Sequence, residues 1–151
     1  MSPTVIGFIK VSLISLLAGV ILGVLMAAGV FNGAGRPYMV TAAHAHVNLL
    51  GFVCMLIFGV AYHILPRFSG KPLYSEGLAT AQLWLNITGL VGMFVMLMAA
   101  AYSQADLMRY GVAPFGAIFA LGAVVFVFNM LKTIGGEPPP PLVSPKPAPK
   151  G

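Results

Sequence analysis

Charged side chains are scarce in this sequence, and their scarcity argues against a soluble fold. Only 7% of the 151 residues are charged, whereas 59% are hydrophobic. A soluble domain usually carries about 25% charged residues, so the composition predicts a protein that is embedded in a membrane. The alternation of apolar and polar residues that is typical of a membrane β-barrel is also missing, which favours helices.

Acidic residues and cysteines are almost missing, and this narrows the possible chemistry. The chain has three acids, Glu76, Asp106 and Glu137, and a single cysteine, Cys54. Hydrolysis by a pair of carboxylates is therefore not expected, and no disulfide can form within the chain. The sequence also contains no glycine-rich phosphate loop, no nucleophile elbow and no CxxC motif. We expect Cys54 to be an ordinary small apolar residue within a helix.

Long apolar runs are present instead, at residues 5–30, 39–65, 78–102 and 112–134. Each run exceeds the roughly 20 residues that a membrane-spanning helix needs. The sequence therefore predicts an all-α membrane protein in which residues 1–134 form one domain, a four-helix bundle that runs up and down. The proline-rich residues 135–151 are expected to form an extended, disordered tail in the cytoplasm.

The basic residues indicate how this bundle is oriented. If the chain crosses the membrane four times, Arg36 and Arg109 fall on one side and the other Lys and Arg residues fall on the opposite side. Basic residues gather on the cytoplasmic side of membrane proteins, so both termini are expected in the cytoplasm. Because these residues are scattered along the chain, the net charge of +5 does not indicate a nucleic-acid site.

Two sets of residues predict where helices meet. Gly19 and Gly23 lie one turn apart, and such a stripe lets another helix approach closely, although glycine is common in membrane helices in any case. Gln82, Asn86 and Gly89 share one face of the third apolar run. We expect their polar groups to bond to a neighbouring helix.

The three histidines, His44, His46 and His63, all belong to the second apolar run or its end. A polar side chain is costly in lipid, so an intramembrane histidine marks a candidate site. Positions 44 and 46 are about 200° apart on a helix, and two helical histidines grip one metal ion when they are four residues apart, not two. The pair is therefore expected to serve two different centres, and the small alanines around it leave room for a bulky, flat group. The alternative is two neutral histidines that bond to neighbouring helices or water.

His63 belongs to a different part of the membrane. At 1.5 Å per residue it lies about 25 Å from His46 along a regular helix, so it cannot join the same site. It sits beside Pro66 and Arg67, at the interface, and Pro66 is expected to end the helix. A metal role for His63 is the weakest of the three histidine assignments.

Several short motifs occur in an order that is similar to that of a known family. They are Ala43-His44-Ala-His46, Leu50-Gly51-Phe52, the run from Gly59 to Lys71 that contains Tyr62-x-x-x-Pro66-Arg67, Leu73-Tyr74-Ser75, and Gln82-Leu-Trp84. Together they resemble helices ten and eleven of the twelve-helix catalytic subunit of heme–copper oxidases, in particular the C-type cytochrome oxidases and nitric oxide reductases.

The resemblance implies a b-type heme as the cofactor. In that family the first histidine of the motif ligates the high-spin, gas-binding heme and the second ligates the low-spin heme, and His44 and His46 match these positions. Heme propionates would lie near the outer surface, where Arg36 and Arg109 are the available cations. The family's copper ligands, second low-spin ligand, cross-linked tyrosine and proton-channel acids have no counterpart here. Copper is therefore not expected, and the chain is not expected to be an oxidase by itself.

The first hypothesis is a small heme b-binding cytochrome of the bacterial inner membrane. One chain offers one histidine per face, so the heme would be held across a homo-oligomer, either a dimer or a trimer. It would transfer electrons from a respiratory-chain donor or bind nitric oxide or oxygen. The alternative is a heme-free accessory or scaffold subunit of a respiratory complex. A third reading places copper between subunits, on His44, His46, Cys54 and methionines.

Overall fold

The computed structural model describes residues 1–103, 105 and 110–135, and within them the secondary structure is entirely helical. The elements are α1 (Pro3–Ala27), α2 (Pro37–His46), the π-helix η1 (Val47–Cys54), α3 (Met55–Phe68), α4 (Glu76–Tyr102) and α6 (Val112–Gly135). The elements α2, η1 and α3 follow one another without a break, so four helical spans are long and apolar enough to cross a membrane. The prediction of an all-α membrane protein with four spans is thus confirmed.

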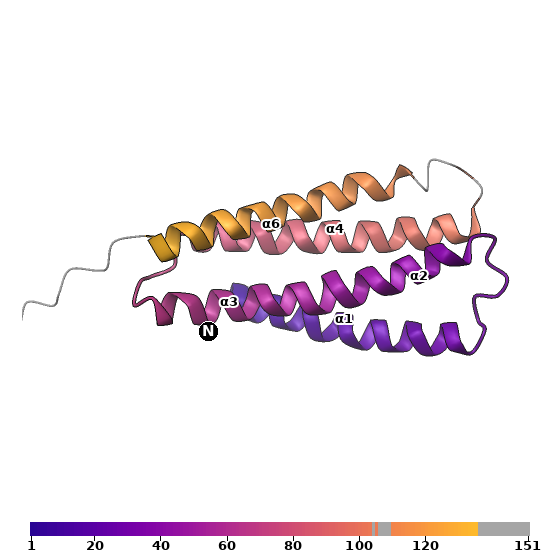
Figure 1. Cartoon of the computed structure of the whole chain (residues 1–151), viewed down its shortest axis with the longest axis horizontal. Coiled ribbons are helices and arrows are strands. Elements are labelled where there is room, and N and C mark those ends of the chain that lie inside the picture. Colours follow the sequence, from indigo (N-terminus) through magenta and orange to yellow (C-terminus); the bar gives the residue numbers. More distant parts are fainter. Residues whose placement is uncertain (104, 106–109, 136–151) are drawn as a thin grey trace, which may run out of the picture.

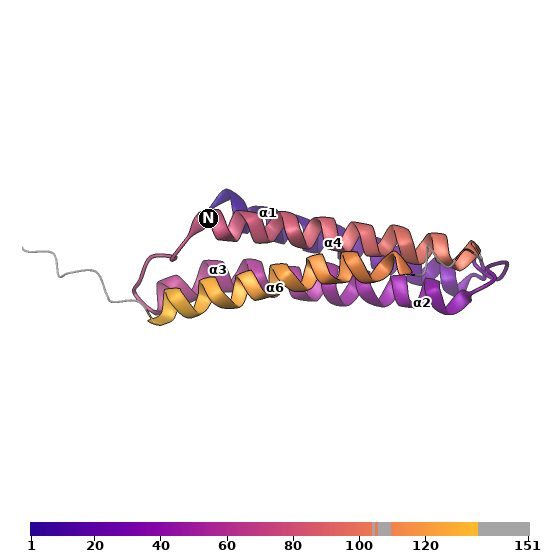
Figure 2. The same ribbon diagram turned by 90° about the horizontal axis from the view of Figure 1, so that it is seen from above.

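The four spans lie side by side along the long axis of the molecule (Figures 1 and 2). The start of α1, the end of α3, the start of α4 and the end of α6 lie together at one end of the bundle. The start of α2 and the histidine pair lie toward the other end. The predicted tail lies outside the described residues from position 136 onward, and Gly135 is the last residue of α6.

Side-chain caps fix the beginnings of two helices. The hydroxyl of Ser2 accepts a hydrogen bond from the Val5 N–H, and Pro3 occupies the first turn, where its missing N–H costs nothing. The hydroxyl of Ser75 accepts from the Leu78 N–H at 3.2 Å. Glu76 adds an acidic group to the first turn of α4, where the helix dipole favours negative charge.

Pro66 does not end the second span, and this prediction was wrong. Helix α3 continues to Phe68, and the Ser69 N–H still donates to the Leu65 carbonyl at 3.0 Å. A proline removes its own N–H and crowds the turn before it, but it places no such limit on the residues that follow. The chain leaves the helix at Gly70, whose positive φ of 64° suits a residue without a Cβ atom.

The second span is also not a regular α-helix. Between Val47 and Cys54 it forms a π-helix, in which each N–H bonds five residues back instead of four. Compared with a regular α-helix, the wider turn changes the direction in which all later residues point relative to the histidine pair. The helix also advances less per residue along its axis. The regular-helix separation between His46 and His63 is therefore an overestimate.

An aromatic cluster joins three of the spans in the core. The Phe8 ring of α1 lies 6.1 Å from that of Phe58 and 5.8 Å from that of Tyr62, both on α3. Phe126 of α6 packs on the same two rings, with centroids 4.6 Å from Phe58 and 5.4 Å from Tyr62. The cluster fixes the end of the bundle where the chain begins.

The polar face of α4 does meet neighbouring helices, as predicted. The Tyr62 hydroxyl donates to Oε1 of Gln82, and Nδ2 of Asn86 donates to the Phe119 carbonyl at 3.0 Å. A Cβ atom on Gly89 would lie 2.7 Å from the Phe119 nitrogen, so only a glycine permits this approach of α4 to α6. Because these polar atoms are paired inside the bundle, they hold the helices in one register.

Asn129 on α6 provides a test of this polar packing. It is fully buried, its Oδ1 accepts from the Ser75 N–H at 3.1 Å, and its Nδ2 donates to the Ser75 carbonyl at 2.8 Å. Replacement by alanine leaves both Ser75 groups unpaired, so we expect a loss of about 1–3 kcal/mol in the free energy of unfolding. Denaturant titration in detergent micelles, followed by circular dichroism, measures this loss. The exposed Asn32 is the matched control, and an equal loss in both alanine variants would contradict the prediction.

Candidate functional site at the histidine pair

His44 lies against the first helix of the bundle. A Cβ atom on Gly23 of α1 would come within 3.0 Å of Cε1 of the imidazole, and the ring is half-buried there. Gly19, one turn earlier, lies even closer to the side chain of Asn48. The glycine stripe of α1 is thus a surface of close helix approach, and its partner is the segment that carries the histidines.

Asn48 lies one turn after His44 on the same face of the span. Its Nδ2 lies 3.4 Å from Nδ1 and 3.5 Å from Nε2 of the ring, and it donates to the His44 carbonyl at 2.8 Å. His44 therefore contacts both α1 and Asn48. The sequence analysis did not single out Asn48, although a polar residue four positions after a histidine lies on the same helix face.

His46 has different surroundings, in agreement with the expectation from the helical wheel. Its Nδ1 lies 2.7 Å from the carbonyl oxygen of Ala42, one turn earlier on the same helix. A carbonyl can only accept, so the proton of the neutral ring sits on Nδ1 and the lone pair sits on Nε2. Metal-ligating histidines are commonly fixed in this way, with one ring nitrogen bonded to a carbonyl and the other directed at the metal.

A small hollow adjoins His46 on the outer surface of the bundle. Its volume is about 130 Å³, and its lining residues are Ala45, His46, Leu49 and Leu50. Leu49 is 60% exposed, so the hollow faces out of the bundle. Small-molecule sites usually measure about 300–1,000 Å³, so one chain alone does not enclose a group of heme size here. The π-helix begins directly after His46, and such segments occur frequently at functional sites.

Of the two candidate propionate partners, the structure describes Arg36. It is half-buried at the start of α2, and its backbone N–H donates to the Ala101 carbonyl at 3.0 Å. It precedes His44 by about two helical turns, at the same end of the bundle. Arg109 lies outside the described residues.

His63 is already engaged at the opposite end. Nη1 of Arg67 donates to Nδ1 of His63 at 2.8 Å and also contacts the His63 carbonyl oxygen. The guanidinium thus uses the Nδ1 lone pair that a metal ion would need. In the residues that the structure describes, no three His, Cys, Asp or Glu side chains gather closely enough to hold a metal ion. A copper site on His44, His46 and Cys54 would therefore have to draw on more than one chain.

Comparison with protein families identifies the class to which this chain belongs. The family described as cytochrome c and quinol oxidase polypeptide I matches residues 1–137. Because this match covers most of the chain, the protein is a member of the subunit I family of these oxidases, and the resemblance noted in the sequence is confirmed. Its fold is that of a multi-pass membrane protein.

Among curated proteins, the chain is 26% identical over 162 aligned residues to the cbb3-type cytochrome c oxidase subunit CcoN1 of Stutzerimonas stutzeri. That match covers 91% of this chain and 34% of the relative. A cytochrome c oxidase subunit 1 homolog, described as bacteroid, from Bradyrhizobium diazoefficiens is 26% identical over 136 residues, which cover 74% of this chain and 25% of the relative. The chain thus spans about a third or less of the length of these relatives.

Proposed function

We propose that this protein is a small membrane cytochrome of the bacterial inner membrane, in which a b-type heme is bound through the His44–His46 segment of a homo-oligomer. The observation that carries the proposal is the state of His46. Its Nδ1 is bonded to the Ala42 carbonyl, so the lone pair of Nε2 is available to a metal ion beside an outward-facing hollow. Family membership supports heme as the group whose iron this nitrogen would bind.

The residues around His46 fit one axial ligand and one edge of a flat, apolar group. Leu49 and Leu50 supply apolar surface, and the small Ala45 leaves the backbone accessible. The hollow is too small to enclose a heme, so a second copy of the chain would provide the opposite face and a second His46. The family assignment of His44 to a separate, gas-binding heme requires α1 to move away from His44, because the imidazole now packs against Gly23 of that helix.

When bound, heme would supply a one-electron redox couple, and an open axial position on it would bind a diatomic gas. The protein's part is to orient the ligand ring and to exclude water. His46 is oriented by the Ala42 carbonyl, and Leu49 and Leu50 keep the site apolar. Arg36 and Arg109 are the cations proposed for the propionates, and both termini are proposed to lie in the cytoplasm. With His46 from each of two protomers on one heme, the function would be electron transfer with a respiratory-chain partner.

An absorption spectrum of the detergent-purified protein, oxidised and then reduced with dithionite, tests the proposal. We expect sharp reduced bands that carbon monoxide does not change, because two histidine ligands leave no open position on the iron. Bands that shift with carbon monoxide would indicate an open coordination site on the iron. The proposed function would then be gas binding instead of electron transfer. A folded protein without heme bands, after expression with ample heme, would contradict the proposal.

One observation favours a second candidate, a heme-free accessory subunit of a respiratory membrane complex. Both histidines already have a hydrogen-bond partner within their own span: the His44 ring lies within reach of Asn48 Nδ2, and His46 Nδ1 is bonded to the Ala42 carbonyl. Both histidines would then stabilise helix packing and nothing else. Co-purification with oxidase subunits in a colourless form would support this candidate.

A further inference from the structure

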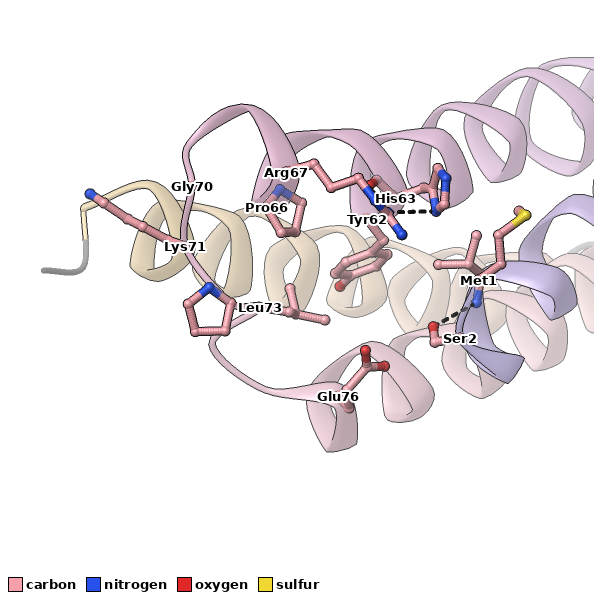
Figure 3. Close-up of a pocket in the computed structure, with 12 residues that line it drawn as sticks. Met1, Ser2, Tyr62, His63, Pro66, Arg67, Gly70, Lys71, Leu73 and Glu76 are labelled. Carbon is pink, nitrogen blue, oxygen red and sulfur yellow. Dashed lines mark hydrogen bonds between the residues drawn. The ribbon is translucent and has the colours of Figure 1, made fainter. Parts of the chain in front are cut away.

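A larger hollow lies at the opposite end of the bundle from the histidine pair. It measures about 420 Å³, within the usual range of about 300–1,000 Å³ for small-molecule sites. Figure 3 shows that its walls come from the first turn of α1, the last turns of α3, the loop that follows, and the start of α4. The proposed cytochrome function makes no use of it.

Two opposite charges face this hollow from different walls. Arg67 runs from the last turn of α3 back along that helix toward His63, and Glu76 directs its carboxylate toward the hollow from the first turn of α4 (Figure 3). The guanidinium is held in place by Nδ1 and the carbonyl oxygen of His63. A ligand that enters the hollow therefore meets a fixed cation on one side and a carboxylate on the other.

Lys71 also contributes to the wall, but its ammonium group is used elsewhere. Its Nζ donates to the carbonyl oxygen of Ile134, in the last turn of α6, at 2.7 Å. Figure 3 shows the side chain directed away from the hollow. Arg67 is thus the side chain that would meet a phosphate here, and arginine is well suited to bidentate phosphate binding.

The position of the hollow corresponds to the headgroup region of a membrane. Three spans have an end at this level, because α1 begins at Pro3, α3 ends at Phe68 and α4 begins at Glu76. The apolar residues Val5 and Leu73 line the walls between the charges. A molecule bound here would lie with polar groups at the membrane surface and apolar groups beneath them.

An apolar groove, separate from the hollow, lies on the outer face of the second span in the turns that precede Arg67. Its volume is about 410 Å³, and its lining residues, all on the second span, are Leu56, Ile57, Val60, Ala61, Ile64 and Leu65. Val60 and Ile64 precede Arg67 by seven and three positions, so they share its side of the helix. A hydrocarbon chain attached to a group at Arg67 could therefore follow the groove.

We propose that the hollow and the groove together bind one phospholipid with a phosphoethanolamine headgroup. The phosphate would bond to Arg67, the ammonium group would pair with Glu76, and one acyl chain would lie along Val60 and Ile64. The paired charges of the hollow match a zwitterion better than an anion, and the groove matches a lipid better than a soluble phosphoester. The site is independent of heme.

Native mass spectrometry of the detergent-purified protein, incubated with equal amounts of phosphatidylethanolamine and phosphatidylglycerol, tests this proposal. We expect one phosphatidylethanolamine to be retained in preference. Arg67→Gln should lower the affinity for it about tenfold, since charge-assisted hydrogen bonds are lost. Glu76→Gln should abolish the preference between the two lipids and leave binding of phosphatidylglycerol intact.

Lys132→Gln is the matched control, because it removes a cation from the same end of the bundle. The Lys132 ammonium lies over the Phe128 ring, outside the hollow. Equal losses in Arg67→Gln and Lys132→Gln would overturn the site in favour of general charge attraction. Equal retention of both lipids by the unaltered protein would overturn the ethanolamine assignment. Competition by free phosphoethanolamine at the same concentration as the lipid would overturn the lipid assignment.

Discussion

We expect replacement of His46 by alanine to remove the low-spin heme bands that we propose for the reduced spectrum of the purified protein. His46 has its Nδ1 bonded to the Ala42 carbonyl and its Nε2 available, so the ring is already oriented for the proposed role as a ligand. Loss even of groups that only support a metal ligand lowers metal affinity about 10–100-fold. We therefore expect heme content to fall by at least about tenfold, measured as the pyridine hemochrome per protein.

His63→Ala is the control for this experiment, since it removes a histidine at the opposite end of the same span. Its heme content should equal that of the unaltered protein. Added imidazole should restore the bands of the His46→Ala protein, because a free ring can fill the space that the side chain leaves. Unchanged heme content in His46→Ala would sink the ligand assignment, and failure of imidazole together with altered circular dichroism would point to misfolding instead.

Replacement of Gly89 by alanine separates α4 from α6 and destabilises the bundle. The added Cβ would lie 2.7 Å from the backbone nitrogen of Phe119 and 2.8 Å from the backbone oxygen of Phe115. Backbone atoms of a helix cannot move singly, so the two helices must shift apart. Such overpacking costs about 1–3 kcal/mol, which denaturant titration in micelles measures as a lower free energy of unfolding.

Gly116→Ala on α6 is the control for Gly89→Ala. Its Cβ would meet only the sulfur of Met93, at 3.6 Å, which is an ordinary contact. Alanine is favoured over glycine in a helix interior by about 1 kcal/mol, so this variant should be as stable as the unaltered protein or more so. Similar destabilisation by both substitutions would show that backbone clash is not the cause.

Hydropathy predicted the number of spans and most of their limits. In lipid the backbone N–H and C=O groups must bond to each other, and an apolar segment achieves this by forming a helix. The prediction failed at Pro66 and within Val47–Cys54 for a common reason. The continuation of the helix past Pro66 and the π-helix both depend on which carbonyl each backbone N–H bonds to, and hydropathy carries no information on that choice. The π-helix is at least as apolar as the α-helices on either side of it, so its hydropathy is that of any membrane-spanning segment.

The histidines of the candidate site could be predicted from the sequence, but the residues around them could not. Two histidines in an apolar run were evident, but the roles of their neighbours were not. Gly23 contacts His44 from another helix, and His46 depends on a backbone carbonyl that no side-chain pattern encodes. The hollow at Arg67 is lined by two stretches, residues 1–5 and 62–76, and no pattern within either stretch reveals that the two meet.

Because of the π-helix, the second span should tolerate deletion of a residue within Val47–Cys54 better than deletion in its α-helical parts. A turn in which N–H groups reach five residues back holds more residues than a regular turn. Deletion of a residue within Val47–Cys54 would let this segment relax to an α-helix without breaking the span. The later half would then keep its orientation, whereas a deletion in the α-helical parts of the span would turn it relative to the histidines and carry Tyr62 away from Gln82. The segment thus sets the angle between the two ends of the span, and with it the relation of the histidine site to the core.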